Sequence, residues 1–403
     1  MPTLTTMEQT STQFELRLAS RMARLGTETA FEVLNKARAL EKQGKNIVHL
    51  EIGEPDFDTP ANVVDAAIDA LHKGWTHYGP SAGLPELRQA IAEEVSRSRG
   101  VKCKSDEVVV VPGGKPIIFF SVLALVDVGD EVIYPNPGFP IYESMINYIG
   151  GRAIPIALRE ERDFRLDVDE LASLITDRTK LIIINSPQNP TGGVLSRQDI
   201  HDIAEVIGDR NIMVLADEIY SRLIFEGEHY SIMAVPGFKE RTILLDGFSK
   251  TYAMTGWRMG YGVMRPDLAA HMTRLMTNSN SCTASFTQIA GIEALRGEQA
   301  SVDRMRNEFQ RRRDAFVAGL NRIKDFSCRM PKGAFYVFPN VQKTGWKSKK
   351  LADALLDDAG VACLSGTAFG DFGEGYLRFS VANSLENLKE ALARIEKWTA
   401  KNL

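Results

Sequence analysis

Cysteine and histidine are scarce in this chain of 403 residues, and neither occurs at the spacing of a metal or redox site. The four cysteines (Cys103, Cys282, Cys328 and Cys363) lie far apart and form no Cys-x-x-Cys pair. Their spacing excludes the usual thiolate zinc sites and a disulfide framework, and it favours a reducing compartment. The six histidines include no His-Glu-x-x-His motif, so we expect no metal site.

Long apolar runs and an excess of one charge sign are also missing. No segment reaches the roughly 18–20 apolar residues of a membrane helix. The net charge is −4 with both signs interspersed, which indicates neither a nucleic-acid nor a membrane surface. The first thirty residues carry three arginines, but they also carry Glu8 and Glu15 and lack the apolar core of a signal peptide. We therefore expect a cytoplasmic protein whose N-terminal segment is an arm that packs elsewhere on the molecule.

Five short apolar runs, separated by segments with helical patterns, occupy the middle of the chain. The runs lie within 107–114, 130–139, 180–190, 212–220 and 241–250. Segments such as 116–128 and 196–209 read as helices between them. Continuous rather than alternating apolar runs are typical of parallel strands that are buried on both faces. The pattern predicts an α/β fold with a mostly parallel central sheet and flanking helices.

The regular alternation ends near residue 285. A long charged helix over 301–323, strands within 333–340 and 375–382, and a final helix over 384–400 follow without a βα rhythm. This part predicts a smaller α+β domain. We therefore expect three parts: an N-terminal arm and helix that pack on the small domain (1–45), a large domain (46–284) and the small domain (285–403).

Each apolar run ends in polar or glycine-rich residues. Those ends hold Gly113-Gly114, Phe139, the segment from Asn185 to Gly192, the segment from Asp217 to Tyr220, and Ser249-Lys250. In open parallel sheets, ligands bind outside the carboxyl ends of the strands. We therefore expect these residues to meet at one edge of the sheet and to form a ligand site.

Taken singly, each of these residues has an ordinary structural explanation. Lys250 can be a solvated turn lysine, Asp217 a helix N-cap and the glycine pair a simple turn. The sequence around Lys250, GFSKT, resembles the end of a P-loop, but the required GxxxxGK is absent.

Together the residues fit pyridoxal phosphate, which requires an amine, an acid, an anion site and an aromatic ring. Lys250 would form a Schiff base with the cofactor, and Asp217 would bind its ring nitrogen. Tyr220 and Asn189 would donate hydrogen bonds to the phenolate oxygen. The remaining contacts would come from the backbone amides near Gly114 and from Arg258 to the phosphate, and from Phe139 stacked on the ring.

Seven motifs occur in an order that is specific for one family. They are EIGEPDFDTP (51–60), HYGPSAGLPELR (77–88), PGGK (112–115), NPTGG (189–193), DEIY (217–220), SKTYAMTGWRMGY (249–261) and LRFSVA (377–382). Over roughly residues 30–400 the sequence resembles the fold-type I, pyridoxal-phosphate-dependent class I/II aminotransferases. It is most similar to the bacterial aspartate aminotransferase subgroup.

The resemblance implies a role for each matching residue. Lys250 would also move the proton between the substrate Cα and the cofactor. Arg378 would bind the substrate α-carboxylate beside Gly53. Tyr78 would reach the cofactor phosphate of a neighbouring subunit, which implies a homodimer with shared active sites. The implied reaction moves the amino group of an L-amino acid to a 2-oxo acid such as 2-oxoglutarate.

Three positions depart from the family's commonest pattern. Gly247 stands where many relatives have a phosphate-binding serine, so Ser249 or backbone amides would have to replace that contact. Lys115 follows the glycine pair. In some aspartate-using members a lysine here binds the distal carboxylate of the substrate, which favours an acidic amino acid. A counter-charge for phosphate and a surface lysine are the alternatives. The expected serine/threonine pair is not cleanly present in LGTETAFEV (25–33).

Two rival functions stay open at this stage. Another reaction on the same scaffold, such as that of a C–S lyase, a decarboxylase or an oxidase, would use the same cofactor. A regulator that keeps the fold would need an additional DNA-binding domain, for which we find no room before the matched region.

Overall fold

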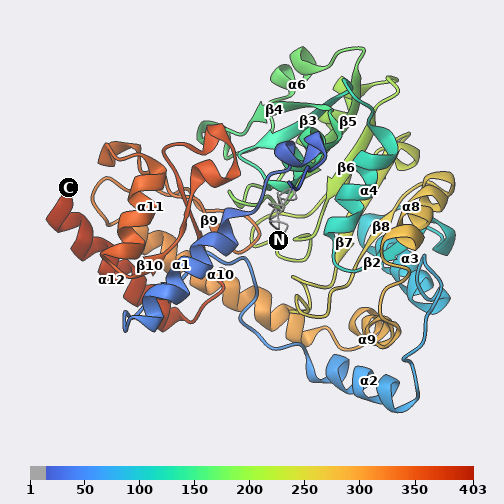
Figure 1. Ribbon diagram of the computed structural model, residues 1–403, viewed down its shortest axis with the longest axis horizontal. Helices are drawn as coiled ribbons and strands as arrows, with labels where there is room; N and C mark the ends of the chain where they lie inside the picture. The colour runs from blue at the N-terminus through green and yellow to red at the C-terminus, as the bar shows by residue number, and fades with distance from the viewer. Residues whose placement is uncertain (1–14) are drawn as a thin grey trace, which may run out of the picture.

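The computed structural model describes residues 15–403, so the predicted N-terminal arm lies partly outside the described residues. The ribbon has a larger part, built around a central sheet, and a smaller part that contains both the first helix and the last (Figure 1).

A seven-stranded sheet forms the centre of the larger part, in the order β2-β8-β7-β6-β5-β3-β4. The strands are β2 (Val108–Val111), β3 (Glu131–Asn136), β4 (Arg152–Ala157), β5 (Thr179–Asn185), β6 (Met213–Asp217), β7 (Thr242–Gly247) and β8 (Gly260–Val263). Only the pairs that include β8 are antiparallel. The predicted mostly parallel sheet is therefore confirmed, and all five apolar runs lie in it.

Both faces of this sheet are covered, which explains the continuous apolar runs. Along β5, Ile183 belongs to the buried cluster on one face, whereas Ile182 and Ile184 belong to the cluster on the other. In β2, Val109 and Val110 divide in the same way. Successive side chains of a strand point to opposite faces, so a strand covered on both sides needs an apolar residue at every position.

Helices surround the sheet and build the smaller part. They are α1 (Thr29–Lys42), α2 (Ala61–His72), α3 (Pro85–Arg99), α4 (Lys115–Leu125), α5 (Ile141–Ile149), α6 (Val168–Leu174), α7 (Arg197–Ile207), α8 (Pro266–Ser279), α9 (Ser285–Arg296), α10 (Ala300–Leu320), α11 (Ser348–Asp357) and α12 (Leu385–Asn402). Local signals fix several ends. Ser196 and Asp199 form a capping box at the start of α7, and Gly100 ends α3 in the left-handed region.

Short strands build the smaller part together with α10, α11, α12 and the first helix, α1. The strands are β1 (Val48–His49), β9 (Tyr336–Val337), β10 (Val361–Ala362), β11 (Leu364–Ser365) and β12 (Leu377–Ser380). They form a three-stranded sheet, β11-β12-β9, and a parallel pair, β1-β10. One buried cluster joins β1, β9, β10 and β12 to α10, α11 and α12. The expected smaller α+β unit is therefore present.

The packing divides the chain differently from the boundaries expected from the sequence. Although α9 begins at residue 285, it packs on α2 and α3 of the larger part. The helix α10 takes part in both buried clusters, with Val302 in that of the larger part and Phe316 in that of the smaller part. The strand β1 pairs with β10, so residues 48–49 belong with the smaller part. We therefore place the boundary inside α10, where the packing changes but the helical pattern does not.

The described N-terminal segment contacts both parts. The 3₁₀ turn η1 (Ser20–Arg24) packs on α5, to which Arg24 donates hydrogen bonds at the carbonyls of Asn147 and Tyr148. The helix α1 instead packs on the smaller part, where Ala37 lies in a cluster with Leu356. Within residues 15–403, no helix combines the length and the hydropathy that crossing a membrane requires.

Candidate active site

A cavity of about 530 Å³ opens between the carboxyl ends of the parallel strands and the smaller part. Its size is typical of a site for a small molecule. Most of the predicted site residues line it: Gly53, Gly114, Lys115, Phe139, Asn189, Asp217, Tyr220, Ser249, Lys250, Arg258 and Arg378. The structure therefore brings together residues that are distributed over most of the sequence. Two predicted residues lie outside this lining, Gly113 next to it and Tyr78 away from it.

Lys250 is partly buried in this cavity, and a backbone carbonyl holds its amine. Its Nζ donates a hydrogen bond of 2.6 Å to the carbonyl oxygen of Gly53. Burial, with further contributions from the positive charges of Arg378 and Arg258, lowers the pKa of Lys250 to about 8. A large part of the Lys250 population is therefore neutral near pH 8, as a nucleophile or a proton acceptor must be.

Asp217 ends β6, and its carboxylate is buried beside an aromatic hydroxyl. Tyr142, on α5, donates a hydrogen bond of 2.5 Å to Asp217 Oδ2, and the Ile219 amide donates one of 3.3 Å to Oδ1. Burial raises the pKa of Asp217 to about 6, although these hydrogen bonds oppose the rise. A buried carboxylate at this position matches what the protonated ring nitrogen of pyridoxal phosphate requires.

Arg378, on β12, is buried and enclosed by aromatic rings. Its Nη1 donates to Asn189 Oδ1 at 3.1 Å, and its Nη2 donates to the carbonyl oxygen of Glu51. The guanidinium lies 4.5 Å from the ring centre of Tyr336 and 4.9 Å from that of Phe369. Its Nε is buried without a hydrogen-bond partner. A buried guanidinium with an unused donor is suited to bind a carboxylate.

The turn after β2 forms a cradle for an anion. Gly113 has φ +82°, and a Cβ there would collide with the guanidinium of Arg258. The glycine therefore allows the arginine to lie against the turn. Arg258 itself has φ +52° and donates to the Thr255 carbonyl at 2.7 Å. Because α4 begins at Lys115, its N-terminal amides open on the same place, where a phosphate is favoured.

Gly247, which replaces the expected serine, has a structural cause. A Cβ at this position would lie 2.9 Å from the Cα of Gly260 on β8. The backbones of β7 and β8 thus approach too closely for a side chain, and serine would require β8 to move. Ser249, the hydroxyl expected to replace the missing contact, lines the cavity, as does Thr255.

Three residues that contribute to the site were not predicted from the sequence. They are Glu28, Tyr142 and Tyr336. Tyr336 bonds the hydroxyl of Tyr220 at 2.8 Å, and the side chain of Asn185 accepts a hydrogen bond of 3.0 Å from the Asn189 amide. Asn185 was expected at the site, because it ends an apolar run, and it lines the cavity. The two tyrosines lie in helical or strand segments, and only the packing of those segments directs them to the cavity.

Glu28 comes from the segment 25–33 that lacked the expected serine/threonine pair. It forms an ion pair with Lys115, whose Nζ also lies 5.7 Å from the ring centre of Phe139. Glu28, Thr29, Ala30 and Phe31 all line the cavity. The N-terminal end of α1, with Glu28 just before it, therefore forms one wall of the site.

The residues present fit pyridoxal phosphate in every part that the cofactor needs. An amine, a buried acid, an anion cradle and the buried tyrosine Tyr220 all face one cavity. The cradle would be filled by a side chain at Gly113, and Arg378 Nε is a buried donor without a hydrogen-bond partner. The cavity would therefore accept both the cofactor and an amino-acid carboxylate.

Comparisons with known proteins agree with this geometry. The family model of class I and II aminotransferases matches residues 45–395. An aspartate aminotransferase of Pyrococcus horikoshii is 41% identical over 383 residues, which cover 94% of this chain and 96% of the relative. An aromatic-amino-acid aminotransferase of Thermococcus litoralis is 37% identical and covers 95% and 98%, respectively.

Solved structures give the same result. The aspartate aminotransferase of Rhizobium meliloti superimposes with a TM-score of 0.92 at 36% identity, and the match covers 96% of this chain and 99% of that one. An aromatic aminotransferase of Pyrococcus horikoshii superimposes with a TM-score of 0.87 at 40% identity, covering 91% and 99%. The chain therefore belongs to the class I and II aminotransferases, which are pyridoxal-phosphate-dependent enzymes.

Proposed function

We propose that this aminotransferase takes an aspartate-like L-amino acid as donor and a 2-oxo acid such as 2-oxoglutarate as acceptor. The observation that supports it most directly is that two cations, Arg378 and Lys115, line the same cavity. We assign the α-carboxylate of the substrate to Arg378 and a second, distal carboxylate to Lys115. A dicarboxylic substrate can contact both.

The buried residues divide the work of the reaction. The bound cofactor supplies an electron sink for the negative charge that develops at the substrate Cα. Arg378 fixes the α-carboxylate and so orients the Cα–H bond toward Lys250. The Lys250 amine, neutral in part near pH 8, accepts the proton from Cα and later returns it. Tyr336 holds the hydroxyl of Tyr220, and Asp217 would hold the ring nitrogen.

The Glu28 side chain affects whether the cavity favours an acidic or an aromatic amino donor. The ion pair with Glu28 neutralises Lys115, so an acidic substrate has to replace one carboxylate by another. An aromatic donor is the second candidate, because Phe31, Phe139 and Phe369 also line the cavity. Two relatives carry the name aromatic aminotransferase.

The half-reaction with a single amino acid tests the proposal. The cofactor-loaded protein is mixed with L-aspartate in the absence of any 2-oxo acid, and the oxaloacetate released is quantified. We expect one equivalent per chain from the native protein and none from a Lys250→Ala variant. Release of ammonia or carbon dioxide, or consumption of oxygen, would instead indicate a different reaction on the same scaffold.

Two variants test the substrate side. Lys115→Met is expected to lower kcat/KM for L-aspartate by roughly 10–100-fold, because the distal carboxylate loses its ionic partner, while L-phenylalanine is affected little. Glu28→Gln is expected to raise kcat/KM for L-aspartate, since Lys115 is then free. If both variants change kcat/KM for the two donors equally, Lys115 does not discriminate between donor side chains.

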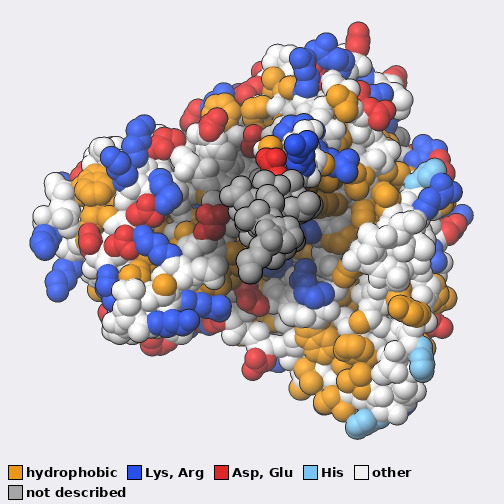
Figure 2. All heavy atoms as spheres, viewed as in Figure 1, with side chains coloured by type: hydrophobic (Ala, Val, Ile, Leu, Met, Phe, Trp, Pro, Cys, Tyr) orange, Lys and Arg blue, Asp and Glu red, His pale blue; other side chains and the backbone are white. Residues whose placement is uncertain are grey.

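We also propose a homodimer with shared active sites and a cytoplasmic location. Tyr78 is 90% exposed, and exposed apolar side chains lie near it in sequence, among them Ile68, Leu71 and Trp75. Hydrophobic side chains are visible in the lower part of Figure 2, where Figure 1 places α2. The four unpaired cysteine thiols support the location. Light scattering of the purified protein tests the dimer, and a Tyr78→Phe variant should then bind the cofactor more weakly.

A further inference from the structure

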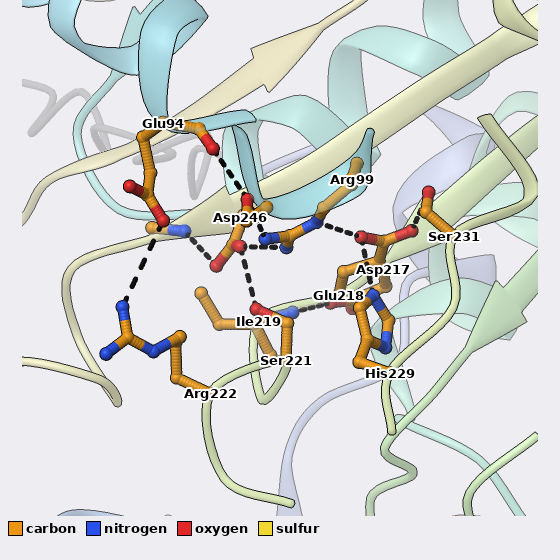
Figure 3. A network of polar contacts seen from close by, with 12 residues as sticks. Glu94, Arg99, Asp217, Glu218, Ile219, Ser221, Arg222, His229, Ser231 and Asp246 are labelled. Atoms are coloured by element: carbon orange, nitrogen blue, oxygen red, sulfur yellow. Dashed lines mark hydrogen bonds and ion pairs between the residues drawn. The ribbon is translucent and has the colours of Figure 1, made fainter. Parts of the chain in front are cut away.

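A buried cluster of charged side chains lies at the ends of β6 and β7, next in sequence to residues that line the cavity (Figure 3). Its centre is Arg99, the last residue of α3, whose side chain is 3% exposed. Glu218 and Asp246 contact it and are 4% and 6% exposed. None of the three lines the cavity. The reaction as described above does not use them.

Every hydrogen-bonding atom of the two carboxylates has a partner. The guanidinium of Arg99 donates from Nε to Glu218 Oε2 at 2.9 Å and from Nη2 to Asp246 Oδ2 at 2.6 Å. Ser231 donates to Glu218 Oε1 at 2.5 Å, and His229 Nε2 lies 2.8 Å from Glu218 Oε2. On the other side, Asp246 Oδ1 accepts the Gly247 amide at 2.7 Å.

The cluster is attached to the site through adjacent residues of the chain. Glu218 directly follows Asp217, and its amide donates to the Leu245 carbonyl at 2.9 Å. Ser221 directly follows Tyr220 and donates from its hydroxyl to Asp246 Oδ2 at 3.1 Å. The segment from Asp217 to Ser221 is therefore clamped to the end of β7, and Arg99 is the side chain that bridges the clamp.

The cluster also sets the charge behind Asp217. Asp246 and Glu218 both add to the rise in the pKa of Asp217, which burial begins and which the hydroxyl of Tyr142 opposes. Arg99 offsets both carboxylates, and with His229 it keeps the pKa of Glu218 at about 2. Loss of Arg99 would leave two buried carboxylates without their common cation, a strongly unfavourable arrangement.

We propose that Arg99 is a positioning residue for the cofactor site, which acts through Glu218 and Asp246 to hold the segment carrying Asp217 and Tyr220 and to shield Asp217 from two neighbouring negative charges. The inference rests on the role proposed for Asp217 at the ring nitrogen. Arg99 itself touches neither the cavity nor the reacting atoms.

Cofactor affinity as a function of pH tests the inference. The cofactor-free chain is titrated with pyridoxal phosphate between pH 5.5 and 9, and binding is followed by the quenching of tryptophan fluorescence. Arg99→Met is expected to weaken binding by roughly 10–100-fold, as the loss of an outer partner does at metal sites. We also expect the acidic limb of its binding curve to move to higher pH, because Asp217 then ionises less readily.

Two further variants serve as comparisons. Arg99→Lys keeps the charge and should recover most of the affinity and the native pH profile. Arg296→Met removes an exposed ion pair with Glu93, 2.8 Å long, between α9 and the same helix α3. It should behave like the native chain. An Arg99→Met variant that folds and binds the cofactor with the native affinity and pH profile overturns the inference.

Ser221→Ala decides the matter if Arg99→Met does not fold. It removes one hydrogen bond to Asp246 without changing any charge, so we expect a folded protein with cofactor affinity reduced a few-fold and an unmoved pH profile. One outcome would overturn the inference: Arg99→Met does not fold, and both Ser221→Ala and Arg99→Lys bind the cofactor with native affinity. Arg99 would then be required for folding only. A native chain that neither binds pyridoxal phosphate nor transaminates would contradict the proposed function instead.

Discussion

Asp217 is a buried acid whose proposed partner, the ring nitrogen of the cofactor, is not part of the chain. Burial raises the pKa of Asp217 to about 6, so its ionisation is unfavourable in the folded state. The protonated Asp217 therefore contributes stability to the folded chain that is fully present below the pKa of the unfolded chain. This stability is lost as the pH rises through about 6 and the folded carboxyl ionises. We therefore expect the ionised, buried Asp217 to destabilise the cofactor-free chain at neutral pH, and a protonated ring nitrogen beside it would remove this destabilisation.

An Asp217→Asn variant makes this destabilisation measurable. In urea unfolding of the cofactor-free chain at pH 8, we expect the variant to be more stable than the native chain by about 1–3 kcal/mol, with a smaller difference at pH 5. Its transaminase activity should fall by roughly 10²-fold or more. Asp267→Asn, which changes an exposed acid, is the control. A stability difference that does not depend on pH would contradict the argument.

At the scale of single residues, the sequence predicted the groups that stand at strand ends and missed those that reach the cavity from elsewhere. Lys250, Asp217 and Arg378 were found because strand ends and family motifs mark them. Tyr142 and Glu28 were not, because a tyrosine within a helix pattern and a glutamate before one have no local signature. Only the packing of α5 and of the segment before α1 directs these side chains to the cavity.

Among the elements, the turn from β2 into α4 carries a testable requirement for glycine. Gly113→Ala should strain the backbone by about 1 kcal/mol and displace Arg258 from the anion cradle. Gly129→Ala is the matched control, since its φ is +90° but no atom lies within 4 Å of an added Cβ. We expect only Gly113→Ala to weaken binding of pyridoxal phosphate, by tenfold or so, while binding of unphosphorylated pyridoxal stays unchanged. Equal loss of both ligands would show that strain alone is responsible.

The contact between α10 and α12 depends on a glycine inside a helix. Glycine to alanine normally stabilises a helix by about 1 kcal/mol. At Gly319, however, a Cβ would collide with Leu392 of α12, so we expect Gly319→Ala to destabilise the chain by about 1–3 kcal/mol. Asn307→Ala, at an exposed position of the same helix, should be neutral or slightly stabilising. Thermal unfolding compares the two, and a higher Tm for Gly319→Ala would refute the collision.

The elements that the sequence predicted are those with strong and unbroken patterns, such as β5 and α10. The strands β4 and β8 were missed for physical reasons. β4 (RAIPIA) lies at the sheet edge with a proline and half-buried residues, and β8 (GYGV) contains two glycines that let it pass close to its neighbours. Neither has the continuous apolar run of a central strand.

For the molecule as a whole, the cavity joins two hydrophobic cores. Its walls come from the large sheet, from β11 and β12 of the smaller part, and from the N-terminal end of α1. A ligand that contacts all three stabilises them together, and at a concentration of 100 Kd the added stability is about 2.7 kcal/mol. We therefore expect calorimetry to show one unfolding transition that shifts upward with pyridoxal phosphate. Two transitions, of which only one responds, would mean that the parts unfold separately.

The pairing of β1 with β10 has a consequence for how the chain acquires its structure. Val48 lies beside Val361, so a strand made at the start of synthesis finds its partner only when the chain is nearly finished. Closing so long a loop is entropically costly and slow, whereas the central sheet can form from neighbouring segments. The strand β1 and the helix α1 would then pack on the rest of the folded chain last. The wall of the active site that contains Glu28 would be completed only at that late step.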